Sequence, residues 1–194
     1  DGSAEFRING DFVINHAKGT NVTIKLNNNS GNNAKLLVNG NLDMTMSGSS
    51  DDLLIEAYAA NDSIVIAGNV LFKNNRTSSG ADMIINMGSS SKLLVGGNID
   101  FQGVRNQNME LLLNSTSKLL LGGSILRQAS PSKFGKITMG NDATLIFNGT
   151  DTQSWEANTG NTDHNTYRSV TVNNTSPVTP QVVLNGDVTI TSTL

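Results

Sequence analysis

The acidic side chains of this chain are of the type that could cleave a polysaccharide, but their spacing does not bring them together. Such chemistry needs two carboxylates, or a carboxylate and a base, converging on one site. Asp51 and Asp52 are adjacent in a turn-like segment, whereas Asp43, Asp100 and Glu110 fall at different positions of the repeat described below. We therefore expect a solvated turn at Asp51-Asp52 and no catalytic residues, so the chain is not predicted to be an enzyme.

Metal and cofactor chemistry has equally little support in the sequence. His16 and His164 stand far apart and have no second ligand near them. Cysteine is absent, which excludes disulfides, thiolate chemistry and cysteine metal sites. No carboxylate-rich loop of the calcium-binding type is present. We predict no metal and no cofactor.

An aromatic segment, predicted as a long loop over 150–166, is the main candidate for a ligand site. This segment and the tyrosine that follows it supply Trp155, His164 and Tyr167, and Trp155 is the only tryptophan of the chain. An exposed aromatic ring can stack on the apolar face of a sugar. The alternative is that the loop covers the side of the molecule with its own small cluster of side chains.

Composition indicates a turn-rich β protein. The 194 residues include 27 Asn and 19 Gly, and only 15% are charged. The net charge of −3 gives no basic field for nucleic acid. No apolar run approaches the length of a membrane helix, so we expect no membrane insertion.

The strongest signal is a hydrophobic triplet that runs into a glycine and recurs about every 26 to 30 residues along most of the chain. The residues four and two positions before each glycine are always hydrophobic, and this period-2 spacing predicts a β-strand with one buried face. A second strand leaves each glycine and a third follows a variable loop. The anchor glycines are Gly10, Gly40, Gly68, Gly97, Gly123, Gly149 and Gly186.

Three strands per coil predict an all-β parallel β-helix of about six to seven coils and about 30 Å in length. Third strands are expected at 22–26, 53–55, 83–87, 109–113, 137–139 and 170–172. The whole chain, 1–194, is expected to be a single solenoid segment of a longer protein, because neither end carries the polar cap that a solenoid needs. Small polar residues follow each glycine and are expected to stack as a hydrogen-bonding ladder, running through Asp11, Asn41, Asn69, Asn98, Ser124, Thr150 and Asp187.

Arg127 interrupts the regular pattern, because it stands where the two preceding coils have Phe72 and Phe101. Either the strand ends early at this point or the register slips. The nearby Pro131 favours the first alternative.

The outward position three residues before each glycine predicts a lateral contact face. Alternation places this position in solvent, yet it is apolar in six of the seven repeats, and such a stripe marks a surface that packs against something. The alternative is that another part of the chain covers this sheet, because strands buried on both faces read as continuous apolar runs. The six residues are Leu37, Val65, Leu94, Leu120, Ile146 and Val183.

Residues 144–194 resemble a repeat unit of very long Bacteroidota cell-surface proteins. The resemblance rests on Leu145 to Thr150, Gln153-Ser154-Trp155, Tyr167 to Asn174 and Val182 to Ile190. It implies an adhesin-like β-helical stalk, coiled right-handedly, on a type IX secretion substrate. It also implies that Asp62-Ser63-Ile64 could be an O-glycosylation site at Ser63.

We therefore predict a structural and interaction segment of an extracellular bacterial surface adhesin or fibre. Its expected partners are other protein chains, copies of itself or glycans. The alternative is a carbohydrate-binding or carbohydrate-active β-helix, which would require the aromatic segment and acidic residues to line one groove. An ice-binding solenoid is disfavoured, because it would need threonines in regular rows on one flat face and the threonines here do not recur at one position of the coil.

Overall fold

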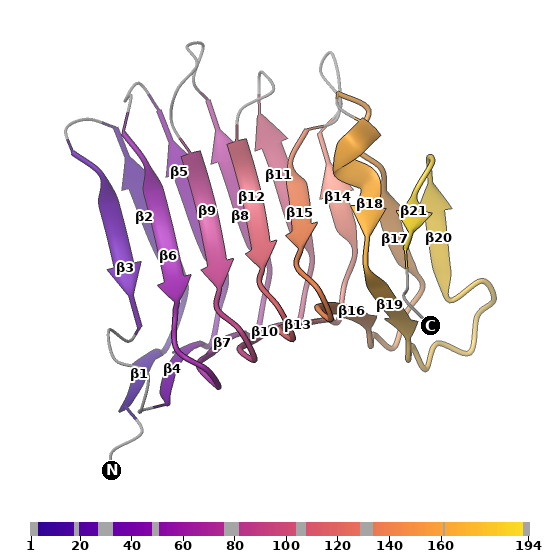
Figure 1. Cartoon of the computed structure of the whole chain (residues 1–194), viewed down its shortest axis with the longest axis horizontal. Coiled ribbons are helices and arrows are strands. Elements are labelled where there is room, and N and C mark those ends of the chain that lie inside the picture. The colour runs from indigo at the N-terminus through magenta and orange to yellow at the C-terminus, as the bar shows by residue number, and fades with distance from the viewer. Residues whose placement is uncertain are drawn as a thin grey trace.

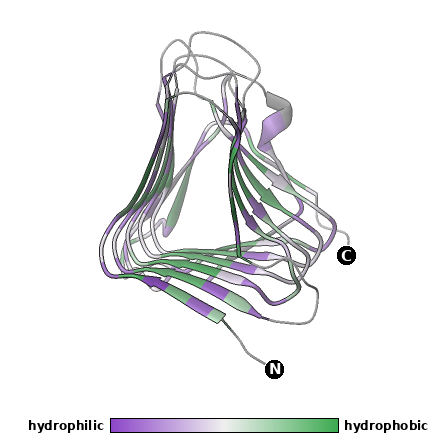
Figure 2. Ribbon diagram, turned by 90° about the vertical axis from the view of Figure 1, so that its left-hand side faces the viewer, coloured by the Kyte–Doolittle hydropathy of each residue, from purple (hydrophilic) through white to green (hydrophobic). Residues whose placement is uncertain are grey.

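The chain winds around one axis as a parallel β-solenoid with a triangular cross-section (Figure 1, Figure 2). The structure is a computed structural model that describes residues 4–17, 20–26, 33–47, 51–75, 82–103, 108–128, 134–160 and 162–191. Neighbouring strands lie one coil apart in the sequence and pair in parallel, as β4 with β7 and β7 with β10. The predicted fold class, a β-helix with three strands per coil, is confirmed.

Two seven-stranded sheets form two sides of the triangle. Sheet A contains β1 (Ala4–Ile8), β4 (Ala34–Val38), β7 (Ser63–Ile66), β10 (Lys92–Val95), β13 (Lys118–Leu121), β16 (Thr144–Phe147) and β19 (Ser169–Val172). Sheet B contains β2 (Phe12–His16), β5 (Leu42–Met46), β8 (Val70–Asn74), β11 (Ile99–Gly103), β14 (Ile125–Arg127), β17 (Gln153–Glu156) and β20 (Val182–Asn185).

The third side is shorter. Sheet C contains β3 (Val22–Lys25), β6 (Leu53–Ala57), β9 (Asp82–Met87), β12 (Asn108–Leu113) and β15 (Lys136–Met139). In the last two turns a separate pair of strands takes the place of sheet C, namely β18 (Thr166–Tyr167) and β21 (Thr189–Ile190). A 3-10 turn, η1 (Thr162–Asn165), directly precedes β18. The solenoid thus has about five regular turns, and the predicted six to seven coils are reached only by including these two irregular ones.

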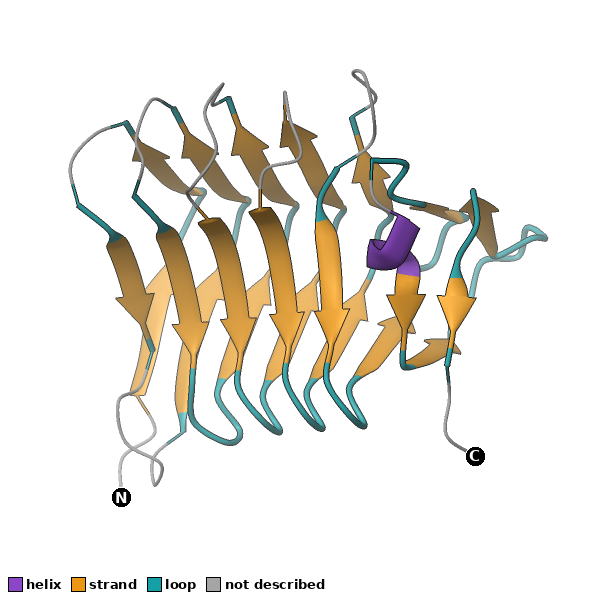
Figure 3. Cartoon of the chain, turned by 45° about the horizontal axis from the view of Figure 1, so that its top comes forward, coloured by secondary structure: helices purple, strands orange, loops and turns teal. Residues whose placement is uncertain are grey.

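The coil is right-handed. In Figure 3 the sheet C strands in front run downward, the sheet B strands behind run upward, and the chain advances from the N-terminal end on the left to the C-terminal end on the right. This agrees with the handedness that the family resemblance implies, and with the strong right-handed preference of connections between parallel strands.

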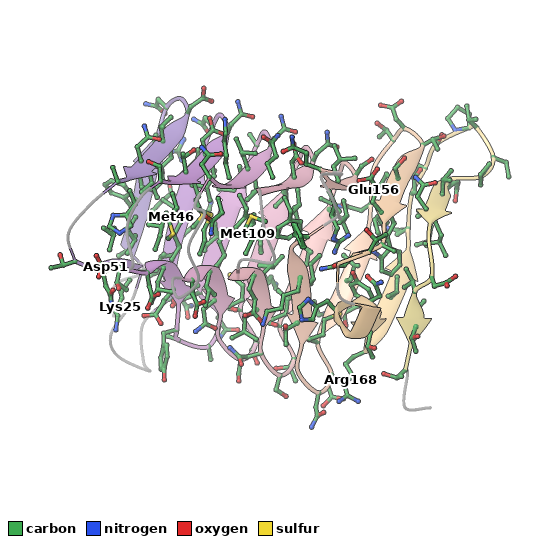
Figure 4. The ribbon with its side chains drawn as sticks, turned by 90° about the horizontal axis from the view of Figure 1, so that it is seen from above. Lys25, Met46, Asp51, Met109, Glu156 and Arg168 are labelled. Atoms are coloured by element: carbon green, nitrogen blue, oxygen red, sulfur yellow. The ribbon has the colours of Figure 1, made fainter. Side chains whose placement is uncertain are left out.

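Alternating side chains fill the interior. In the second coil the strands β4, β5 and β6 alternate strictly between buried and half-buried residues. Equivalent inward residues stack coil upon coil, and the rings of Phe72 and Phe101 lie parallel with centroids 4.9 Å apart. Met46 and Met109 point into the interior from opposite sheets (Figure 4) and have no exposed surface. This stack is the predicted core.

The polar ladder at the corner between sheets A and B forms as predicted over its first five members. Each side-chain oxygen accepts the backbone N–H of the equivalent residue in the next coil. The distances are 2.7 Å from Asn41 N to Asp11 Oδ1, 2.8 Å from Asn69 N to Asn41 Oδ1 and 2.7 Å from Asn98 N to Asn69 Oδ1. The ladder then passes from Ser124 Oγ to the backbone of Ser154, so Thr150 and Asp187 are not members.

A second stacked turn joins sheet C to sheet A. In four successive coils a backbone N–H closes the turn on the carbonyl three residues earlier, as from Ser91 to Gly88 and from Ser117 to Asn114. The residue before the closing one takes positive φ although it is not glycine, 61° at Ser90 and 62° at Thr116. The closing residue is fully buried in these four coils, so this corner belongs to the core as much as the strands do.

The predicted register fails in the last two coils. Residues 170–172, expected in a third strand, belong to β19 of sheet A, whereas 182–184, expected in sheet A, belong to β20 of sheet B. The expected loop at 150–166 contains β17, which pairs with β20. The physical reason is that the corner between β19 and β20 begins with Asn173 and Asn174 in place of a glycine. Counting from glycine to glycine therefore misses this corner, and Gly186 follows a strand of sheet B instead of one of sheet A.

Arg127 keeps the register of its coil and points inward. It pairs with Phe101, and β14 ends at this residue, so the early end of the strand is confirmed and the slip is not. The guanidinium lies over the Phe101 ring at 5.4 Å and donates from Nε to Gly135 O at 3.3 Å. Pro131 lies outside the described residues.

Candidate functional site

The expectation that Asp43, Asp100 and Glu110 fall at different positions of the repeat is wrong for two of them, because Asp43 and Asp100 share one position of the coil, three residues after the corner glycine. Asp43 and Asp100 point outward from sheet B, in one row with Leu71 between them. Glu110 lies on sheet C and pairs with Lys136 at 2.9 Å. Among the described residues no group of three His, Cys, Asp or Glu side chains could hold a metal ion. The carboxylates therefore do not share a site.

The Asp51-Asp52 turn is partly structural. Asp52 accepts the backbone N–H of Asp82 at 2.9 Å, which ties two coils together. Asp51 lies at the rim of the molecule (Figure 4). Both residues are half-buried, so the turn is less solvated than predicted.

A contact face lies on the outer surface of sheet A and follows the predicted stripe with one correction. Five residues stand side by side in register and are half-buried, namely Leu37, Val65, Leu94, Leu120 and Ile146. Arg7 adjoins this row at one end and Thr171 at the other. Val183, predicted as the sixth member, pairs with Ser154 in sheet B and faces a different side of the triangle.

A row of lysines flanks the contact face on one side. Lys35, Lys92 and Lys118 point outward two residues before the apolar row, with Ser63 between Lys35 and Lys92. Lys35 pairs with Glu5 at 3.2 Å, and no ion pair involves Lys92 or Lys118 within the described part of the chain. These lysines stand five residues before Gly40, Gly97 and Gly123, a regularity of the sequence that the predicted contact face did not include.

Small residues flank the contact face on the other side and leave a shallow groove of about 410 Å³ beside it. Ala67, Gly96 and Gly122 occupy this edge. A Cβ added to Gly96 would lie 2.3 Å from the carbonyl oxygen of Ala67, so close approach of successive coils requires glycine there. The contact face thus combines an apolar row, positive charges on one edge and a groove on the other.

The aromatic segment predicted as a ligand site is buried. Trp155 is 2% exposed and Tyr167 is 0% exposed. The Trp155 indole packs on Phe147 and meets Tyr167 edge-on at 4.5 Å, donating from Nε1 to the Tyr167 hydroxyl at 3.3 Å. Neither ring can stack on a sugar in this structure, because both fill the core of the last turns.

His164 lies beside this cluster, half-buried in η1. Its Nδ1 is 3.4 Å from Asn158 Nδ2. Asn158 in turn donates to Gly135 O at 2.7 Å, and Asn165 Oδ1 accepts the Asn158 backbone N–H at 2.7 Å. The surroundings of His164 are a network of amides that holds the irregular turn in place.

Ser63 opens β7 and points outward on sheet A, half-buried between the lysines. The aspartate before it has a structural role. Asp62 is fully buried and accepts the backbone N–H groups of Ala34 at 2.8 Å and Ala59 at 2.9 Å. The Asp-Ser-hydrophobic sequence is thus explained by the turn, and glycosylation of Ser63 stays a prediction.

The residues that carry the family resemblance also have structural roles. Gln153 is 1% exposed, and its Nε2 donates to Leu121 O at 2.9 Å. Asn174 Nδ2 donates to Gln153 Oε1 at 2.7 Å and to Asp151 O at 2.7 Å. These buried amides satisfy backbone groups at the corner where the glycine pattern ends, which a buried chain must do.

Comparison with protein-family models, with curated proteins and with solved structures finds no match to this chain. No helix in the described residues is long and apolar enough to cross a membrane. The functional conclusion therefore depends on the architecture and on the surfaces described above.

Proposed function

We propose that this chain is a structural and interaction segment of an extracellular bacterial surface adhesin or fibre. In this role the solenoid is a stiff stalk, and the contact face on sheet A binds other protein chains or copies of the same chain. The resemblance of residues 144–194 to Bacteroidota surface proteins supports export by the type IX route.

The observation that carries the proposal is the continuity of the backbone pairing along the axis. Sheets A and B each run through seven strands, and sheet C runs through five. In the regular turns each coil is therefore held to the next by three sets of parallel hydrogen bonds and by the corner ladder. Bending the rod would break several of these bonds at once while opening the stacked core, so the architecture favours a mechanical role.

The contact face gives this stalk a means of lateral association. Its apolar row is bounded at both ends by polar side chains, so it is a delimited patch. Apolar rows of this kind on a sheet are commonly covered by a partner. The lysines along one edge favour a partner that brings acidic side chains to that edge.

The alternative of a carbohydrate-active domain loses its proposed site, because Trp155 and Tyr167 are buried and the carboxylates lie apart.

Electron microscopy of the full-length protein on its source cells, with an antibody raised against these coils, tests the stalk. We expect long thin rods that the antibody decorates along their length at the cell surface. A compact particle, or labelling confined to the cell interior, would refute the proposal.

Lateral association is tested by Leu94→Asp, which places a charge in the middle of the contact face. The matched control is Leu54→Asp, because Leu54 is also half-buried and outward-facing but lies on sheet C. We expect Leu94→Asp to keep its far-UV circular dichroism and to lose association in analytical ultracentrifugation or in cross-linking on cells, while the control retains it. Equal association in both variants would contradict a role for this face.

A further inference from the structure

A slot lies on the corner that follows sheet C, on a different side of the solenoid from the contact face. One residue directly follows the sheet C strand in each of four successive coils, namely Tyr58, Gly88, Asn114 and Gly140. Their backbones are linked in series, with Gly88 N donating to Ala57 O at 2.7 Å, Asn114 N to Met87 O at 2.9 Å and Gly140 N to Leu113 O at 2.7 Å. Gly88 lies between Tyr58 and Asn114 in this series and carries no side chain.

The close approach of successive coils requires glycine at position 88. A Cβ on Gly88 would lie 2.4 Å from the carbonyl oxygen of Tyr58 and 2.8 Å from that of Ala57. No larger residue fits there without moving the backbone. Tyr58 and Asn114 stand two coils apart, about 9.6 Å at the usual strand spacing. A depression of about 440 Å³ lies beside these residues, and its size is typical of small-ligand sites.

The side chains around the slot are neutral. Besides Tyr58, Gly88 and Asn114, the lining includes Asn86, Leu112 and Ser115. Tyr58 is 69% exposed, the largest exposure of any large hydrophobic side chain in the described residues. Packing does not explain an aromatic side chain at this position, because most of its surface is exposed to water.

The two asparagines are oriented by hydrogen bonds. Asn114 Nδ2 donates to Asn86 Oδ1 at 2.8 Å and to Met87 O at 2.9 Å, which uses both of its hydrogens. Asn114 Oδ1 is then left as an acceptor, and Asn86 Nδ2 as a donor, with no partner within the described part of the chain. The slot therefore presents a fixed acceptor and a fixed donor beside an exposed aromatic ring.

From this geometry we propose that the slot binds a neutral saccharide. A pyranose ring stacked on Tyr58 at van der Waals distance, about 3.5–4 Å, lies between Tyr58 and Asn114. Its C–H face covers the aromatic ring, and its hydroxyl groups, which both donate and accept, meet Asn114 Oδ1 and Asn86 Nδ2. The absence of charged lining residues in the slot favours an uncharged sugar over a uronic acid or a sulfated one.

Saturation-transfer NMR on the full chain tests the proposal, with lactose, cellobiose, methyl α-mannoside and diacetylchitobiose as neutral probes and digalacturonic acid as the charged control. Probes are used at about 10 mM, where a site with a Kd of about 1 mM is nearly saturated. We expect binding of at least one neutral probe, unchanged in Tyr58→Phe and weakened about tenfold or more in Tyr58→Ala. Asn86→Asp keeps the oxygen that accepts from Asn114 but removes the donor, and we expect it to weaken binding as well.

Val13→Ala is the matched control, because Val13 is 53% exposed and lies on sheet B. This variant and Leu94→Asp should both bind the probe as the parent does, so the slot is tested separately from the contact face. Circular dichroism establishes that each variant is folded. The proposal is overturned if no neutral probe binds, if Tyr58→Ala binds as tightly as the parent, or if only the charged control binds.

Discussion

Replacing Asp62 by alanine should destabilise the solenoid strongly, although the residue belongs to no functional site. Its carboxylate accepts two backbone N–H groups, from Ala34 at 2.8 Å and from Ala59 at 2.9 Å, and has no exposed surface. A hydrogen bond to a charged group contributes about 1.5–3 kcal/mol net, so losing two costs about 3–6 kcal/mol. Ala34 lies in the preceding coil, so the loss also weakens the contact between turns.

Alanine itself fits this position of the turn. Ala143 closes the equivalent turn two coils after Ser91, with its N–H donating to Gly140 O at 3.3 Å, and it is fully buried. Steric strain therefore does not contribute to the effect of Asp62→Ala. Ser91→Ala is the matched control, because it removes only the bond from Ser91 Oγ to Gly88 O at 2.6 Å and should cost about 0.5–1.5 kcal/mol.

Urea unfolding followed by circular dichroism measures both variants, with the free energy of unfolding obtained by linear extrapolation. Hydrogen exchange at the amides of Ala34 and Ala59 reports the local effect. A loss below about 1 kcal/mol in Asp62→Ala, or a loss no larger than in Ser91→Ala, would refute the role assigned to this carboxylate.

Two further predictions concern Asp100 and Trp155. Burial raises the pKa of Asp100, the hydrogen bond from Gln102 opposes this, and Glu156 adds to the rise. The folded state then binds the Asp100 proton more tightly than the unfolded state, so ionised Asp100 costs stability, and this cost disappears as the pH falls from the raised pKa to the ordinary one. Asp100→Asn keeps an oxygen that accepts from Gln102 and should raise the midpoint of urea unfolding at pH 7. It should also make this midpoint depend less on pH between the raised and the ordinary pKa of Asp100. A midpoint with the same pH dependence as in the parent would contradict this prediction. Trp155, the only tryptophan, should show blue-shifted fluorescence that acrylamide quenches weakly and that sugars leave unchanged, whereas emission typical of a water-exposed indole would place the aromatic segment on the surface.

The regular coils could be predicted from the sequence because the information there is local and repeated. Inward residues alternate along each strand, and a glycine marks each corner, so Leu36, Ile64 and Leu93 could be aligned without any structure. The same alignment predicted the polar ladder at Asn41 and Asn69, because small polar side chains at one position of every coil must stack.

The surfaces could be predicted only in part. Alternation correctly placed Leu37, Val65, Leu94, Leu120 and Ile146 in one row, because five consecutive coils keep one register. Tyr58 could not be linked to a site from the sequence, because the other residues that line the depression beside it come from the next two coils.

The tertiary structure alone decided the last two coils. The corner there is held by a hydrogen bond between the side-chain amides of Gln153 and Asn174, which are 21 residues apart in the sequence. No local sequence pattern predicts such a contact. Aromatic residues in a polar segment suggested an exposed loop, yet Phe147 offers Trp155 a buried surface on which to pack. Local alternation and corner glycines thus determined the coil by themselves, whereas contacts between distant side chains decided which residues the irregular turns bury.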